Sequence, residues 1–245
     1  MLLIALAPRL IRSAFDGLIL GAFIGLGFQV VEDVLYAVNS AASAFGANQL
    51  SNGGQTIGVR IITSIPSHWM YTAIFCAGLV WFIGRPNSPP RKLLGLSLIF
   101  SAMLLHGLWD GVAGFASFTA SLAIVGPLVA GIAVIVMFIA VYRLSVGAER
   151  NWMRELMAPE LELGVITPDE LAALSGNRKE RKAYVKSAKG HRSHRTARHV
   201  IEAETDLGLQ LARDRGEDTP AVSHARDEVR RLRRGQGGHL PAADS

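Results

Sequence analysis

Charged residues are scarce in the first 142 positions of this 245-residue chain. Only ten charged side chains lie there, whereas residues 143–245 hold 19 of the 25 Lys and Arg residues and 16 of the 20 Asp and Glu residues. Cysteine is scarce too, and the single Cys76 excludes a framework of intramolecular disulfides. The sequence therefore predicts an apolar, membrane-embedded domain over residues 1–145 and a charged, basic tail over residues 146–245.

Four segments are apolar enough and long enough to cross a bilayer, for which a helix needs about 20 residues. They cover residues 17–38, 61–84, 93–115 and 121–142. Residues 1–7 are apolar but too short to span, and they lack the charged start of a signal peptide. We expect an all-α, polytopic transmembrane helix bundle of about four full spans, preceded by a truncated N-terminal helix and followed by a charged, partly helical tail.

The loops between these segments differ in charge. Basic residues lie in 9–12, in 85–92 and throughout the tail, whereas residues 39–59 and 116–120 carry no charge. Arg60, at the outer end of the second segment, is an exception. Because cytoplasmic loops are enriched in Lys and Arg, the pattern predicts a multi-pass protein of the cell membrane with a cytoplasmic C-terminal tail.

The few ionisable residues inside the segments fall at one depth. A helix rises about 1.5 Å per residue, which places Glu32 roughly 8 Å below the outer boundary of the hydrocarbon layer. By the same rule His68 and His106 lie about 10 Å down, with Asp110 one turn above His106. Three predicted helices thus bring ionisable side chains to a single layer.

Glycines accompany these residues on the first segment. Gly17, Gly21 and Gly25 share a helical face with Glu32. Small residues at this spacing let membrane helices approach closely. We therefore expect Glu32 to face a partner helix rather than lipid.

Several explanations fit this layer. Structural ones are a protonated Glu32, a packing His68 and an inert pair of His106 and Asp110. Hydrolysis is a second: a carboxylate or imidazole takes a proton from water while a neighbouring histidine stabilises the oxyanion. Alternatively Glu32, His68 and His106 ligate zinc and leave a position open for water. A proton or cation relay would use the same residues without catalysis.

Three short motifs lie on separate predicted helices. They are Phe28-x-x-x-Glu32 followed by Asp33, His68-x-x-x-Thr72-Ala73, and His106-x-x-x-Asp110 with Trp109. Together with the glycine-rich run FDGLILGAFIGLGF, they resemble the PrsW-type intramembrane proteases over residues 10–145. That group is similar to the CAAX prenyl endopeptidases and the bacteriocin-processing membrane peptidases. The resemblance implies cleavage of a membrane-anchored protein, such as an anti-sigma factor, near the outer face.

The sequence departs from the family pattern in one motif. That pattern begins with Glu-Glu-x-x-Lys on a preceding helix, and the residues before the first segment contain no such motif. Two expectations follow: either the start of the chain lies further upstream, or the protein is a shortened relative without activity. Residues 1–7 match the apolar stretch that would follow the motif.

Our leading hypothesis is a membrane-embedded protease of the glutamic or metallo type. Glu32, His68 and His106 would activate water and stabilise the oxyanion, Asp110 would orient His106, and zinc is a candidate cofactor. Phe28, Asp33, Thr72 and Trp109 would support them. The alternatives are an ion-coupled transporter, for which the segments show no convincing repeats, and an inactive membrane scaffold.

The tail carries its own signals. Residues 167–170, TPDE, form a helix capping box with proline at the first helical position. Residues 178–198 are densely basic and, beside a membrane, predict attraction to anionic lipid. We expect no nucleic-acid partner, since Tyr184 is the only aromatic residue there for base stacking. The last ten residues are expected to be disordered.

Overall fold

The computed structural model describes residues 10–43, 47–63, 65, 67–85, 87–115, 120–188 and 191–236. These residues are mainly helical and form no β-sheet, so the all-α prediction is confirmed. The chain divides into two compact units, Met1–Glu149 and Arg150–Ser245. The helix end expected at residues 1–7 and the disorder expected at residues 237–245 lie outside the described residues.

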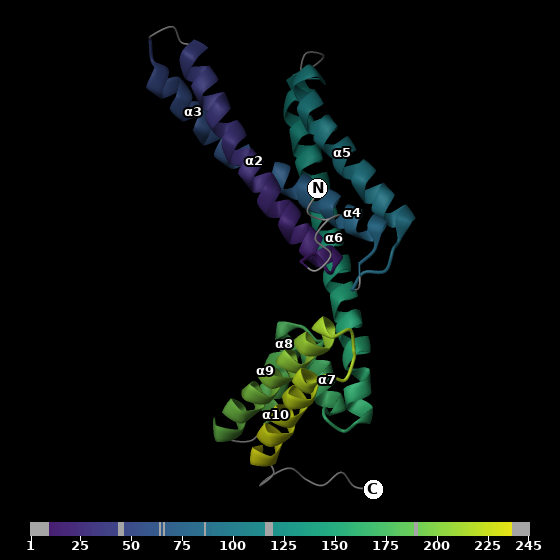
Figure 1. Ribbon diagram of the computed structural model, residues 1–245. Coiled ribbons are helices and arrows are strands. Elements are labelled where there is room, and N and C mark those ends of the chain that lie inside the picture. The colour runs from purple at the N-terminus through teal and green to yellow at the C-terminus, as the bar shows by residue number, and fades with distance from the viewer. Residues whose placement is uncertain are drawn as a thin grey trace. The chain divides into compact units, whose positions relative to one another are not determined.

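The described residues of the first unit form five helices (Figure 1). They are α2 (Ala14–Ser43), α3 (Gln49–Thr63), α4 (His68–Ile83), α5 (Lys92–Phe115) and α6 (Ala120–Glu162), the last of which continues into the second unit. Helix α4 lies between α2 and α5 and packs against both. Helix α3 runs back along the C-terminal part of α2, where the Thr56 hydroxyl donates a 2.8 Å hydrogen bond to Ser40.

Three stretches of described helix are long and apolar enough to cross a membrane: Ala14–Ser43, Lys92–Gly111 and Val125–Glu162. The predicted span over residues 61–84 is not one helix, because α3 ends at Thr63 and α4 begins at His68. Ser67, with an extended backbone, is the N-cap of α4 and marks a fresh helix start. Helix α4 has 16 residues and is therefore only about 24 Å long. The depth predicted for His68 assumed one continuous helix over residues 61–84, and that assumption was wrong.

The closest packing in the first unit joins α2 to α4. Gly17, Gly21 and Gly25 are all buried in this contact. A Cβ atom added at Gly21 would lie 2.4 Å from the Thr72 carbonyl oxygen, and one at Gly25 would lie 2.4 Å from that of His68. The expected close approach of a partner helix to the glycine face is confirmed, and the partner is α4.

The second unit has an apolar core of its own. It contains the end of α6 together with α7 (Pro168–Leu174), α8 (Arg178–Ser187), α9 (His191–Arg213) and α10 (Pro220–Gln236). Met157, Leu207 and Val222 are among its fully buried residues. The predicted capping box is confirmed: the Thr167 side chain accepts a hydrogen bond from the Glu170 backbone, and the Glu170 side chain accepts one of 2.7 Å from the Thr167 backbone. Much of the basic run 178–198 lies in α8 and α9.

A buried carboxyl group lies inside this second core. Glu204 on α9 is 0% exposed, and neither of its oxygens has a hydrogen-bonding partner among the described residues. Burial, together with the nearby charge of Glu170, raises the pKa of Glu204 to about 9. Glu170 is itself held by the Tyr184 hydroxyl, which donates a 3.1 Å hydrogen bond, and lies 3.6 Å from Arg233. Glu204 is therefore protonated at neutral pH in the folded chain.

The glycine contact yields a paired test. Gly25→Ala should push α4 away from α2 and lower the melting temperature of the chain in detergent, because its Cβ would also lie 2.6 Å from Cα of Trp69. Gly27→Ala, two residues further on the same helix, has nothing within 4 Å and should be as stable or more stable, since alanine favours helix by about 1 kcal/mol. Equal melting temperatures for both variants would contradict the tight contact between α2 and α4.

The buried Glu204 predicts a pH effect on the second unit. The unfolded chain releases this proton near the ordinary pKa of 4.5 and the folded chain keeps it to about 9, so its contribution to stability falls as pH rises through that window. The slope is about 1.4 kcal/mol per pH unit. Glu204→Gln should protect α9 from hydrogen exchange in the full chain more at pH 8 than at pH 5, relative to wild type.

Glu202→Gln is the matched control for this measurement, because Glu202 lies on the same helix and is exposed. It should leave α9 protection unchanged at both pH values. A Glu204→Gln effect of equal size at pH 5 and pH 8 would mean that ionisation of Glu204 does not govern the stability of this helix.

Candidate active site

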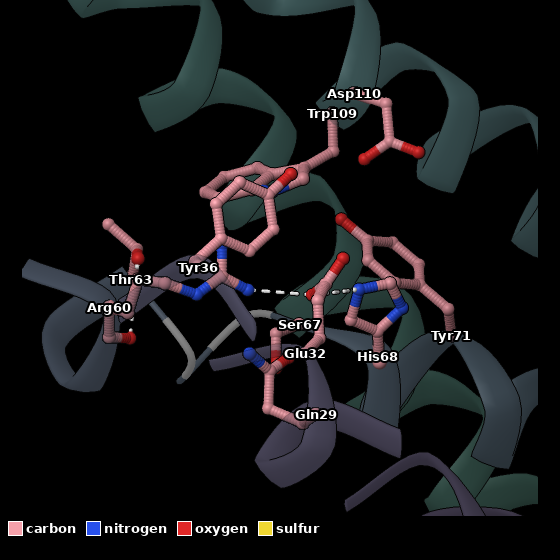
Figure 2. A pocket seen from close by; sticks show the side chains of 10 residues that line it. All are labelled: Gln29, Glu32, Tyr36, Arg60, Thr63, Ser67, His68, Tyr71, Trp109 and Asp110. Atoms are coloured by element: carbon pink, nitrogen blue, oxygen red, sulfur yellow. Dashed lines mark hydrogen bonds and ion pairs between the residues drawn. The ribbon is translucent and has the colours of Figure 1, made fainter. Parts of the chain in front are cut away.

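A polar cavity of about 260 Å³ opens among α2, α3, α4 and α5 (Figure 2). Within a mainly apolar unit, its walls gather acidic, basic, imidazole, amide and hydroxyl groups. The lining residues are Gln29, Glu32, Tyr36, Arg60, Thr63, Ser67, His68, Tyr71, Trp109 and Asp110. The cavity is therefore a place where water and a polar reacting group can be held inside the bundle.

Four of the predicted site residues form one continuous row. Oε2 of Glu32 lies 2.9 Å from Nε2 of His68, and Nδ1 of His68 lies 2.9 Å from Nε2 of His106. Nδ1 of His106 lies 2.9 Å from Oδ2 of Asp110. Helices α2, α4 and α5 thus bring these side chains into direct contact.

The row needs one proton more than two neutral imidazoles provide. Each of its three contacts is of hydrogen-bond length and requires one shared proton, whereas His68 and His106 bring one proton each when neutral. The third proton makes one ring an imidazolium or resides on a carboxyl group. The row can therefore hold a proton and pass it between Glu32 and Asp110, whose side chain is 60% exposed.

Arg60 closes the other side of Glu32. Its Nη2 atom donates a 2.6 Å hydrogen bond to the Glu32 oxygen that also contacts His68, and its Nε atom donates to Asp33. The guanidinium lies 4.1 Å from the centre of the Tyr36 ring, a cation–π contact. Arginine suits this position because its planar fork can serve two carboxylates at once. Two adjacent carboxylates are thus compensated by one cation.

The supporting residues separate into two groups. The Phe28 ring packs edge-on against His68 with centroids 4.9 Å apart, and Asp33 also accepts a 2.7 Å hydrogen bond from Gln29. Trp109 lines the polar cavity. Thr72 lies instead in an apolar groove of about 320 Å³ between α4 and α5, beside His106.

Six of the ten residues that line the cavity were not predicted from the sequence, and Arg60 and Tyr71 are two of them. Arg60 was interpreted only as an exception in the loop charges, although it is the one basic residue on the same side as the carboxylates. That position was the available signal. Tyr71 gave none, because an aromatic residue in an apolar helix is usually a core residue.

The candidate zinc ligands do not share a coordination point in this arrangement. His68 directs one ring nitrogen at Glu32 and the other at His106, so these two neighbours lie on opposite sides of its ring. A zinc ion needs donors about 2.0–2.2 Å away on all sides of a single point. Across the described part of the chain, no three His, Cys, Asp or Glu side chains converge in this way. The arrangement does not fit a zinc ion.

The arginine contact predicts a measurable coupling. Arg60→Gln should lower the free energy of unfolding in detergent by about 1–3 kcal/mol, because it leaves two partly buried carboxylates uncompensated. In a double-mutant cycle with Asp33→Asn the losses should not add, since one carboxylate no longer needs the cation. Arg91→Gln, in an exposed loop position, should have little effect. Strictly additive losses would show that Arg60 and Asp33 act independently.

Comparison with known proteins identifies a family whose model covers the residues of the cavity. No curated protein and no solved structure matches the chain. The model of one family, described as PrsW family intramembrane metalloprotease, matches residues 1–143, which include every residue of the row and Arg60. The resemblance stated from the motifs is thereby confirmed. The chain belongs to the PrsW family of intramembrane proteases.

Proposed function

We propose that this chain hydrolyses a peptide bond of a membrane-anchored protein in the polar cavity, near the outer face of the membrane. The observation that carries the proposal is how the Glu32 carboxylate is hydrogen-bonded. One of its oxygens is held by both Arg60 and His68, while the other points away from them into the cavity (Figure 2). A carboxylate oxygen that faces a cavity large enough for water is placed as a general base should be.

The reaction follows from these positions. The second oxygen of Glu32 takes a proton from a water molecule, and the water oxygen forms a bond to the carbonyl carbon of the substrate. The electron pair of the carbonyl moves onto its oxygen. When that pair returns, the carbon–nitrogen bond breaks, and the proton held by Glu32 passes to the departing amine. One water molecule is consumed for each peptide bond, and Glu32 returns to its starting state.

The row and Arg60 keep the base in place. Glu32 lies in a largely apolar unit, where an isolated carboxylate would be strongly disfavoured. Two donors on one oxygen compensate its charge and fix its orientation. Asp110 holds the far imidazole, so that His106 in turn orients His68. The family description implies a metal, but the described side chains do not converge on a point that would hold one. In the reaction given above, each proton moves between side chain, water and substrate.

A membrane-anchored protein is the substrate class we favour, because two helices of the site, α2 and α5, contain stretches long enough to cross a membrane. The resemblance to the family implies an anti-sigma-factor-like protein within that class. The exposed basic side chains of α8 would attract anionic lipid at the cytoplasmic face. We place the protein in the cell membrane with its tail in the cytoplasm, since basic residues gather beside residues 9–12, 85–92 and the tail.

Two substitutions test the hydrolytic role. Glu32→Gln and His106→Ala should each abolish the new N-termini that the wild-type chain produces in a membrane fraction, as detected by N-terminal peptide mapping. Glu202→Gln and His199→Ala, which change the same residue types at exposed positions of the second unit, should leave them unchanged. If wild type and Glu32→Gln give the same N-termini, Glu32 is not the base of a hydrolytic reaction; a proton flux lost with Glu32→Gln would then support a relay.

A further inference from the structure

Two buried polar atoms of the residues that line the cavity have no hydrogen-bonding partner among the described residues: the amide oxygen of Gln29 and the hydroxyl group of Tyr71. Only the hydroxyl group can donate a hydrogen bond. Tyr71 is only 4% exposed, and its hydroxyl oxygen has no hydrogen-bonding partner among the described residues. Burying a hydroxyl group without a partner costs about 1–3 kcal/mol. Nearly all buried polar groups in folded proteins have partners, so this exception calls for a function.

The side chain is directed at the reacting space. Figure 2 shows the Tyr71 hydroxyl pointing into the cavity that the second oxygen of Glu32 also faces. The ring is fixed from behind by His106, with ring centres 5.2 Å apart. Tyr71 also lines the apolar groove between α4 and α5, so it stands in the wall between a polar and an apolar space.

The histidine and arginine donors around the cavity are already engaged. Both ring nitrogens of His68 are occupied by Glu32 and His106, and both of His106 by His68 and Asp110. Arg60 donates to two carboxylates. The oxyanion role that sequence analysis gave to a histidine therefore has no free histidine N–H in this arrangement.

We propose that Tyr71 is a catalytic residue, whose hydroxyl group donates a hydrogen bond to the carbonyl oxygen of the peptide bond that is cleaved. The bond strengthens as negative charge develops on that oxygen during attack by water. No proton is transferred by Tyr71, and the bond is released when the carbonyl re-forms. The missing partner of the buried hydroxyl is then the substrate. This inference rests on the proposed protease function.

Tyr71→Phe tests the proposal, because it removes the hydroxyl and keeps the ring against His106. The assay uses a fluorogenic peptide that carries the segment cleaved by wild type, with full-length protein in detergent micelles. We expect kcat to fall by about 10²–10³-fold, as for other single oxyanion donors, while KM changes little. The melting temperature should stay the same or rise, since the lost hydroxyl has no partner among the described residues.

Tyr142→Phe is the matched control. Tyr142 lies on α6 with its ring packed against Phe15 and with 45% of its surface exposed, so kcat should not change. Unchanged kcat in Tyr71→Phe beside an active wild type would overturn the proposal and leave the protease function standing. A fall in kcat accompanied by a lower melting temperature would assign Tyr71 a structural role and overturn it too. A wild type that cleaves nothing would overturn both.

Discussion

Charge placed in an apolar helix bundle has to be compensated where it lies, and this requirement organises the first unit. Glu32 and Asp33 cannot reach bulk water freely, so they draw donors from neighbouring helices. Arg60 comes from α3, His68 from α4 and, one contact further, His106 from α5. The network joins four helices, and each member would be costly to bury without the next. The same contacts therefore hold the helices together and form the site.

The network works only at one spacing of the helices. Helix α2 lies so close to α4 that a Cβ atom at Gly25 would touch the backbone of His68. Glu32, two turns after Gly25 on α2, contacts the side chain of the same His68. A side chain at Gly21 or Gly25 would separate the two backbones and lengthen the contact between carboxylate and imidazole. Glycine is needed here for close approach, while Gly27 on the same helix faces open space. The glycine face thus sets the geometry of the row.

Much of this could be predicted from the sequence, for definable reasons. The scarcity of charge singled out Glu32, His68, His106 and Asp110 as ionisable residues within apolar segments, and the regular rise of a helix applies to Glu32 on α2 and to His106 and Asp110 on α5, but not to His68. The break between α3 and α4 was missed although the sequence signals it, because Pro66 and Ser67 are typical of a helix boundary. Arg60 was invisible as a partner because its carboxylates lie 27 and 28 residues away in sequence.

Hydrolysis of a peptide bond inside a membrane requires water and an apolar polypeptide segment to reach the same point. Water must reach a base, and here the polar cavity offers Glu32 beside Arg60 and an exposed Asp110. An apolar polypeptide segment must reach the same point, and the groove lined by Phe75, Ala102 and Met103 is mainly apolar. The wall between these spaces contains Tyr71 and, on the groove side, His106. A peptide carbonyl is the polar part of an otherwise apolar segment, so in the proposed reaction a donor in that wall recognises the carbonyl while the water remains with Glu32.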